Sequence, residues 1–128
     1  MNSKDQYSDF DSNRFGDLYS EIIKLLNTEK SYQDPNFSKA ILAKKLNTNG
    51  SYISKALSLN GNKKFNQLIN EYRINQVKEE LINKNFQNFT LEYLYMKAGF
   101  TQQSTFNRVF KELTGQTPSE YIESINNQ

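Results

Sequence analysis

The chain has 128 residues and contains neither cysteine nor histidine. The absence of cysteine excludes disulfide bonds and thiolate nucleophiles, and the absence of both residues excludes the usual zinc ligand sets. Without histidine, the most common general acid and base of enzymes is also missing. An enzyme would have to act through carboxylates, lysine, serine or tyrosine, and no spacing in the sequence assembles such groups. The sequence therefore predicts no enzyme, no metal site and no cofactor.

Long hydrophobic runs are absent as well. No apolar stretch approaches the roughly 20 residues that are needed to span a bilayer, and the polar N-terminus MNSKDQYSDFDS is not a secretory signal. We therefore expect a soluble, cytoplasmic segment without membrane contact. At this length, the chain can form one domain or two very small ones with a modest core.

The charge is small overall but unevenly distributed. The net charge is +2; residues 1–37 carry 4 cations and 7 anions, whereas residues 38–128 carry 12 cations and 7 anions. A basic surplus in the later part would suit a polyanionic partner. Many inert domains carry a similar charge, so composition alone does not decide between these interpretations.

The spacing of apolar residues predicts an all-α fold of seven helices. Apolar side chains recur every three or four residues, as in Phe106, Val109, Phe110 and Leu113, which is the pattern of a helix with one buried face. We expect the first helix to start after an N-cap at Asp11 or Ser12 and to end before SYQDPNF. The other expected helices cover residues 39–46, 51–59, 65–83, 91–98, the stretch before Gly115, and 117–125.

Residues with strong terminal preferences delimit these helices. The expected N-caps are Ser38 and Thr90. The residues expected to end a helix with a left-handed backbone are Asn47, Gly99 and Gly115. The last helix carries a capping box with proline at its first position, formed by Thr117, Pro118 and Glu120. We accordingly divide the chain into four parts. Residues 1–11 are a disordered lead-in or vector-derived remnant, and residues 12–64 form the first helix-turn-helix subdomain. Residues 65–84 form a long linker helix, and residues 85–128 form the second helix-turn-helix subdomain.

An internal repeat is the strongest pattern in the sequence. The segment LAKKLNTNGSYISKALS (42–58) aligns with LYMKAGFTQQSTFNRVF (94–110). Each copy consists of a short helix, a turn with a residue that tolerates left-handed backbone, and a second helix whose outer face is polar and carries a cation. This is the pattern of a helix-turn-helix motif.

The dimensions of the DNA major groove indicate a function for this repeat. The major groove is about 12 Å wide and admits one helix that presents short polar side chains and cations to base edges. Two such helices held about 34 Å apart can enter successive grooves of one duplex. Arg108 is suited to guanine, and Gln103 or Asn107 to adenine. Lysines near these helices are either solvated charges or, for one or two of them, phosphate contacts: Lys44, Lys45, Lys63 and Lys64.

The chain resembles the DNA-binding domain of the AraC/XylS family of bacterial transcriptional regulators. AGFTQQSTFNRVFKELTGQTPSEYI is similar to the C-terminal signature of that family, LAKKLNTNGSYISKAL to its first helix-turn-helix, and FNQLINEYRINQVKEEL to its linker helix. The resemblance covers roughly residues 12–125. It implies a sequence-specific regulator that binds double-stranded DNA and places two recognition helices in adjacent major grooves.

The resemblance also implies which residues contact DNA. The base-contacting residues would be Ser51, Ser54, Lys55, Gln103, Ser104, Asn107 and Arg108. The phosphate-contacting residues would be Ser38, Thr90 and Lys111, with backbone amides at the helix N-termini contributing. Arg73 of the linker helix is more consistent with a structural contact.

Two positions depart from the family pattern. Tyr95 stands where the family usually has alanine, so the helix beneath the second recognition helix is expected to be tilted or its pocket enlarged. Gly50 and Ser51 stand where the family often has larger or basic residues. Lys55 is then the sole cation of the first recognition helix, and we expect weaker base readout from the first copy than from the second.

Two other classes of function remain open at this point. The missing histidine and cysteine disfavour an enzyme, and a protein-interaction module is the alternative that we retain. A helical protein-interaction module with the same fold and weak or lost DNA binding would use the same outer faces for a protein partner. With only about 35 residues before the first motif, there is no room for a sensor domain of the kind common in the family. RNA polymerase and the sensor domain of a longer parent protein are therefore the further partners that we expect.

Overall fold

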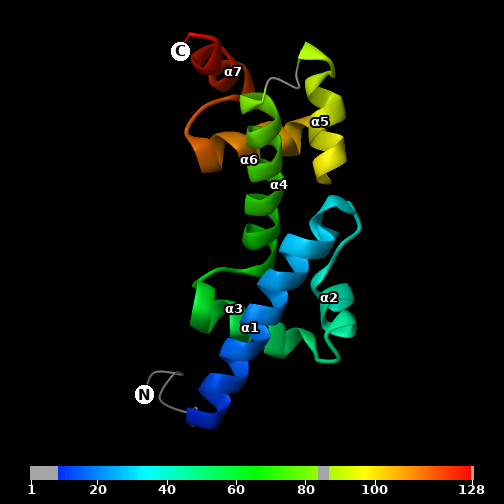
Figure 1. Ribbon diagram of the computed structural model, residues 1–128, viewed down its shortest axis with the longest axis vertical. Coiled ribbons are helices and arrows are strands. Elements are labelled where there is room, and N and C mark those ends of the chain that lie inside the picture. Colours follow the sequence, from blue (N-terminus) through cyan, green and yellow to red (C-terminus); the bar gives the residue numbers. More distant parts are fainter. Residues whose placement is uncertain (1–8, 84–86, 128) are drawn as a thin grey trace. The chain divides into compact units, whose positions relative to one another are not determined.

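The computed structural model describes residues 9–83 and 87–127, and throughout these residues the regular elements are helical. In chain order they are α1 (Asp9–Glu29), the short 3-10 helix η2 (Ser31–Gln33), α2 (Lys39–Lys45), α3 (Gly50–Gly61), α4 (Phe65–Ile82), α5 (Leu91–Ala98), α6 (Gln103–Thr114) and α7 (Pro118–Asn126) (Figure 1). The predicted all-α class with seven α-helices is confirmed for this part of the chain.

The predicted start of the first helix is wrong. Because α1 begins at Asp9, Asp11 and Ser12 lie within its first turn and do not cap it. A cap lies at the boundary of a helix, so residues inside the first turn cannot serve as one. Most of the predicted lead-in, residues 1–8, lies outside the described residues.

The end of α1 agrees with the prediction. The helix ends at Glu29, before the SYQDPNF segment, and Lys30 follows with a left-handed backbone (φ 52°). The chain therefore leaves the helix five residues before Pro35, and the local backbone at Lys30 sets the boundary.

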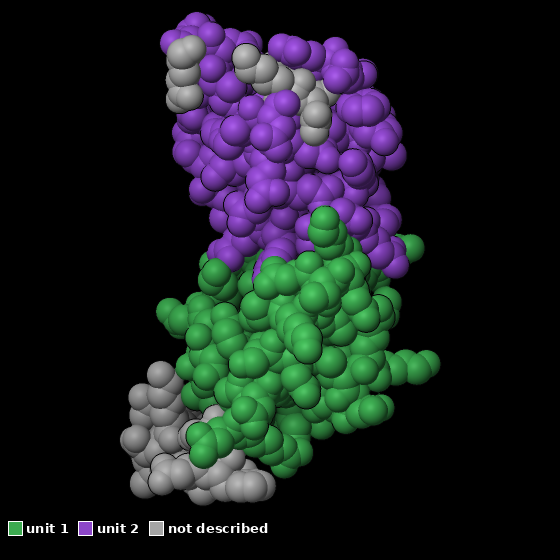
Figure 2. Space-filling view, in the orientation of Figure 1, with its two compact units in different colours: residues 1–31, 36–68 green, residues 32–35, 69–128 purple. Residues whose placement is uncertain are grey.

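The described chain forms two compact units, which are coloured separately in Figure 2. Unit 1 comprises residues 1–31 and 36–68, and unit 2 comprises residues 32–35 and 69–128. Helix α4 contributes Phe65–Leu68 to unit 1 and the remaining residues to unit 2.

In unit 1, helices α1 and α2 both pack against α3. The buried side chains are apolar, as the helical periodicity requires, and include Phe15, Ile22, Leu26, Phe37, Leu42, Ala43, Ile53, Ala56, Leu57 and Leu68. The N-terminal part of α3 is held by aromatic contacts, since the Phe15 and Tyr52 rings meet edge to face with centroids 5.5 Å apart.

Unit 2 is built around the ring of Phe106. Tyr95 stacks on this ring with centroids 4.7 Å apart, and Phe100 and Phe110 lie 5.4 Å and 5.6 Å from it. Helix α7 joins the core through Tyr121, whose ring lies 5.4 Å from that of Phe110. Tyr95 is therefore a core residue, and the larger side chain is accommodated by stacking.

The two copies of the sequence repeat have the same turn. In the first copy, Thr48 N–H donates to the Ala43 carbonyl at 2.9 Å. In the second copy, Phe100 N–H donates to the Tyr95 carbonyl at 3.0 Å, at positions 52 residues later. Both turns end a short helix with a left-handed residue, in the manner of a Schellman motif, and these residues are Asn47 (φ 54°) and Gly99 (φ 117°).

Gly99 is required by packing as well as by its backbone angle. A Cβ atom at this position would lie 2.5 Å from the Arg73 Nε atom and 2.5 Å from the Tyr32 carbonyl oxygen. Arg73 itself donates from Nε to the Tyr32 carbonyl at 2.7 Å and from Nη2 to the Asp34 carbonyl at 3.0 Å. Burial lowers the pKa of Arg73, and the charge of Asp34 opposes this shift. Arg73 therefore holds the 32–35 segment on α4, a structural role.

The apolar stripe of α6 is shorter than its sequence suggests. Phe106, Val109 and Phe110 are buried as predicted, but Leu113 is 41% exposed, so its predicted burial is wrong. Leu113 lies outside the core cluster of unit 2, whose members from α6 are Phe106, Val109 and Phe110. The helix ends one residue later and Gly115 follows with φ 79°, as expected.

Candidate nucleic-acid interface

Helix α3 presents a polar face opposite its buried one. Asn49 caps the helix by accepting a hydrogen bond from Tyr52 N–H at 2.9 Å. Ile53, Ala56 and Leu57 point into unit 1. The predicted base-contacting residues lie on the other side, where Ser51 and Ser54 are exposed and Lys55 is half-buried.

Helix α6 also has a polar face opposite its buried one, and most of the polar side chains on this face are longer than the serines of α3. The predicted base-contacting residues are all exposed, and they are Gln103, Ser104, Asn107 and Arg108. Arg108 Nη1 pairs with Glu112 Oε1 at 3.2 Å, one turn further along the helix. Both side chains of this pair are more than half exposed, so water competes with it and the pair contributes at most about 0.5 kcal/mol.

Two of the predicted phosphate contacts are already used as helix caps. The Ser38 hydroxyl accepts from Ile41 N–H at 3.2 Å, and the Thr90 hydroxyl accepts from Tyr93 N–H at 3.0 Å. These hydroxyl oxygens satisfy donors of their own helices. Any anion at these positions would therefore meet the remaining backbone N–H groups of the first turn.

Lys111 is exposed near the end of α6. Its charge is one of the causes that lower the pKa of Glu120, the first of which is the hydrogen bond from the Thr117 backbone N–H at 2.8 Å. Thr117 and Glu120 form the predicted capping box of α7, with Pro118 at the first helical position. Lys111 thus extends from α6 on the side where α7 begins.

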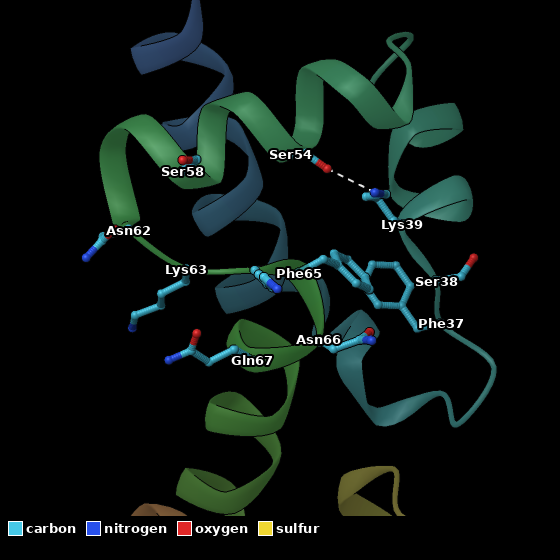
Figure 3. A pocket seen from close by; sticks show the side chains of 11 residues that line it. Phe37, Ser38, Lys39, Ser54, Ser58, Asn62, Lys63, Phe65, Asn66 and Gln67 are labelled. Carbon is cyan, nitrogen blue, oxygen red and sulfur yellow. Dashed lines mark hydrogen bonds between the residues drawn. The ribbon is translucent and has the colours of Figure 1, made fainter. Parts of the chain in front are cut away.

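Lys39 approaches the polar face of α3 from another helix. Its Nζ atom donates to the Ser54 hydroxyl at 2.9 Å (Figure 3). Its Cε atom lies beside Gly50, only 3.3 Å from where a Cβ atom would stand. No sequence pattern predicts this contact, because the two residues are 15 positions apart and no helical periodicity links them.

A groove of about 890 Å³ runs along this side of unit 1. It is lined by Phe37, Ser38, Lys39, Ser54, Ser58, Asn62, Lys63, Lys64, Phe65, Asn66 and Gln67. The Phe37 and Phe65 rings are 5.7 Å apart, and in Figure 3 the Lys39 side chain reaches from the start of α2 toward Ser54. The lining carries three lysines and no acidic residue.

Two other lysines make ion pairs within their own unit. Lys45 Nζ lies 3.3 Å from Glu29 Oε2, and Lys97 Nζ lies 3.1 Å from Glu80 Oε1. The hydrogen bond to Glu80 raises the pKa of Lys97. Lys45, predicted as either a solvated charge or a phosphate contact, thus joins α2 to the end of α1.

Features of other functional classes are not found in the described part of the chain. Within residues 9–83 and 87–127, no histidine, cysteine or acidic side chains form a group that could hold a metal ion. Over the same residues, no helix combines the length and the apolar character that crossing a membrane requires.

Two copies of a short helix, a left-handed turn and a helix with a polar, cation-bearing face define the class of double helix-turn-helix proteins. A family profile described as a helix-turn-helix domain matches residues 42–124, which include both copies. The chain belongs to this family, the AraC-type helix-turn-helix proteins. It has the fold of DNA-binding transcription regulators.

Two solved structures are similar to most of the chain. A protein of unknown function from Listeria innocua is 25% identical, with a TM-score of 0.70 over 81% of this chain and 93% of that one. The C-terminal domain of the two-component response regulator YesN from Fusobacterium nucleatum subsp. nucleatum is 24% identical, with a TM-score of 0.67 over 83% and 98% of the two chains. No functionally curated protein matches the sequence significantly.

Proposed function

We propose that this protein is a transcription regulator that binds double-stranded DNA sequence-specifically and inserts α3 and α6 into adjacent major grooves. One observation carries the proposal. Both copies of the motif bury the same apolar positions and leave a polar face on the second helix, with Lys55 and Arg108 at matching positions. A helix of this kind fits the major groove, where side chains can reach base edges.

The exposed residues divide into base contacts and phosphate contacts. On α6, Arg108 would bind guanine through two hydrogen bonds, and Gln103 or Asn107 would bind adenine, with Ser104 beside them. On α3 the base contacts would come from Ser51, Ser54 and Lys55. The phosphate contacts would come from Lys111 and from the helix N-termini at Ser38 and Thr90.

We further propose that the segment acts as the output part of a signalling protein. The similar structure from Fusobacterium nucleatum is the C-terminal domain of a response regulator. By this comparison, one partner of the present chain would be a sensor-bearing parent protein. DNA and RNA polymerase are the further partners that we propose.

Selection of bound sequences from a random pool of DNA duplexes tests the proposal. The selection is run at about 50 mM and about 200 mM salt, because phosphate contacts make DNA binding fall steeply as salt rises. The expected result is one enriched motif with two half-sites about 10 base pairs apart, centre to centre. Recovery of random sequence, or no retained DNA at the lower salt concentration, would refute sequence-specific binding.

A protein-interaction module is the second candidate, and one surface feature favours it. Phe89 and Tyr93 stack with ring centroids 4.7 Å apart, and both are exposed together with Met96 of α5. Exposed aromatic and methionine side chains are common where proteins bind one another. If DNA affinity is negligible at low salt while substitution of Tyr93 and Met96 by serine abolishes a biological activity, this second function replaces the first.

A further inference from the structure

We infer that Lys39 provides the main positive charge of a phosphate-binding groove in the first helix-turn-helix. It compensates there for the small number of cations on α3. With Lys63 and Lys64, it binds the backbone of a DNA strand. The inference rests on the proposed DNA binding and adds residues from outside the recognition helices. Lys39 was not among the predicted contacts, whereas Lys63 and Lys64 were predicted as either solvated charges or phosphate contacts.

The position of Lys39 depends on a glycine in the recognition helix. Lys39 is the first residue of α2, and its aliphatic chain passes Gly50, the first residue of α3. Because Gly50 has no Cβ atom, the lysine chain can lie close to the α3 backbone. Its ammonium group then reaches Ser54, one turn further along the exposed face of α3.

The absence of a side chain at Gly50 therefore allows Lys39 to add a positive charge beside α3. The first recognition helix has a single cation of its own, Lys55. Lys39 supplies a second positive charge on the same face, from a neighbouring helix. A hydrogen bond to a neutral, exposed hydroxyl leaves the charge of the ammonium group uncompensated, since serine carries no negative charge.

The surrounding groove has the chemistry of a phosphodiester-binding surface. Apart from Ser54, which is assigned to base contact, and the rings of Phe37 and Phe65, its lining combines three lysines with hydroxyl and amide groups, such as those of Ser58, Asn62, Asn66 and Gln67. It contains no aspartate or glutamate. Lysine ammonium groups with hydroxyl and amide donors are the groups that contact the DNA backbone. A continuous strand is the partner that matches, because the lysines come from both sides of the groove, at the start of α2 and between α3 and α4.

The salt dependence of DNA binding tests the inference. The probes are a random-sequence duplex of about 40 base pairs, which is long enough for both half-sites, and the duplex selected above. Each lost phosphate contact should lower the slope of log K against log salt by about 0.9. We therefore expect Lys39→Gln to lower the slope by about one and to weaken binding to both probes by the same factor. Lys39→Arg should keep the slope.

The matched control is Lys24→Gln, an exposed lysine of α1 in the same unit that does not line the groove. It should leave the slope unchanged. If the unaltered protein binds both probes but Lys39→Gln behaves like the control, the inference fails while the proposed function stands. If the unaltered protein binds neither probe, the proposed function itself fails.

A double-mutant cycle tests the link to Gly50. Gly50→Ala introduces a Cβ atom 3.3 Å from the Lys39 Cε atom, so the lysine chain must move by a few tenths of an ångström. We expect a loss of affinity about twofold to fivefold in the protein with Lys39 and none in the Lys39→Gln background, since coupled residues give non-additive effects. Equal losses in both backgrounds would show that Gly50 acts on DNA directly and would overturn this step.

Discussion

At the residue scale, two arginines illustrate opposite uses of the same side chain. Arg73 is half-buried and donates both of its hydrogen bonds to carbonyl groups of the 32–35 segment. Arg108 has 61% of its side chain exposed and a single partner, Glu112, on its own helix. Since an exposed pair of this kind is weak, Arg108 can exchange Glu112 for a guanine at little cost.

Substitution of Arg108 tests base readout. Arg108→Ala should reduce the affinity for the selected duplex by about 1–3 kcal/mol and relax the preference at one base pair, because a bidentate guanine contact is lost. The measurement is competition binding against all single-base variants of the selected site. Lys111→Ala is the comparison and should weaken binding to all variants alike. Unchanged affinity and preference after Arg108→Ala would refute the assignment.

Two glycines with positive φ provide a matched stability test. Gly99→Ala should destabilise unit 2 by about 2–4 kcal/mol, because the new Cβ atom clashes with backbone and with Arg73 in addition to the strained backbone angle. Gly115→Ala also places alanine at a positive φ, here 79°, but nothing lies within 4 Å of the new atom, so the loss should be about 1–2 kcal/mol. Urea denaturation measures both values, and equal losses would contradict the packing role of Gly99.

At the element scale, the two helix-turn-helix copies show how the same backbone turn tolerates different residues. Asn47 and Gly99 both adopt left-handed backbone angles. Asparagine is accepted in the first copy, whereas in the second copy the approach of Arg73 and the Tyr32 carbonyl leaves no room for a side chain. The sequence repeat predicted the turn in both copies, but the reason for glycine in the second came from the contact with α4.

The capping box of α7 should give a measurable pH dependence. The hydrogen bonds from Thr117 hold the pKa of Glu120 below its usual value, so the folded state favours the charged carboxylate. This stabilisation is present above the ordinary glutamate pKa of about 4.3 and is lost as the pH falls through the lower folded-state pKa. Glu120→Gln should therefore lower the Tm at neutral pH, and the difference from the unaltered protein should shrink in acid.

The control for this experiment is Glu123→Gln, an exposed residue of the same helix outside the capping box. Thermal unfolding followed by circular dichroism between neutral pH and about pH 2 covers the range in which glutamate titrates. A Tm difference for Glu120→Gln that is independent of pH would show that the carboxylate charge has no part in the cap.

At the scale of the whole molecule, the chain carries two helix-turn-helix motifs in one polypeptide, one in each compact unit. Most helix-turn-helix proteins place two recognition helices on DNA by forming a symmetric dimer. A single chain with two unequal motifs needs no such symmetry. Its site should therefore consist of two different half-sites in a fixed order.

Changing the spacing of the half-sites tests this arrangement. Insertion of about 5 base pairs between the half-sites turns one of them to the opposite face of the duplex, because one helical turn takes about 10 base pairs. We expect the affinity to fall to that of a duplex with only the α6 half-site, since a single chain can then reach only one groove. Gel-shift titration measures the effect, and undiminished binding would contradict simultaneous insertion of α3 and α6.

The candidate interface was largely predictable from local sequence. The polar faces of α3 and α6 follow from the apolar positions on the opposite sides, and the predicted N-caps at Ser38, Thr90 and Thr117 are confirmed. The position of Lys39 was not predictable. Its contact with Ser54 crosses from one helix to another, and such contacts leave no periodic signal in the chain.

The sequence by itself determined the helices, most of their caps, the two turns and the buried side of each recognition helix, because these depend on residues within one or two helical turns of each other. Tertiary structure alone decided the rest. The exposure of Leu113, the clamp of Arg73 on the 32–35 segment and the passage of Lys39 over Gly50 depend on which surfaces meet when the helices pack. These contacts join residues that are far apart in the chain, so helical periodicity does not predict them.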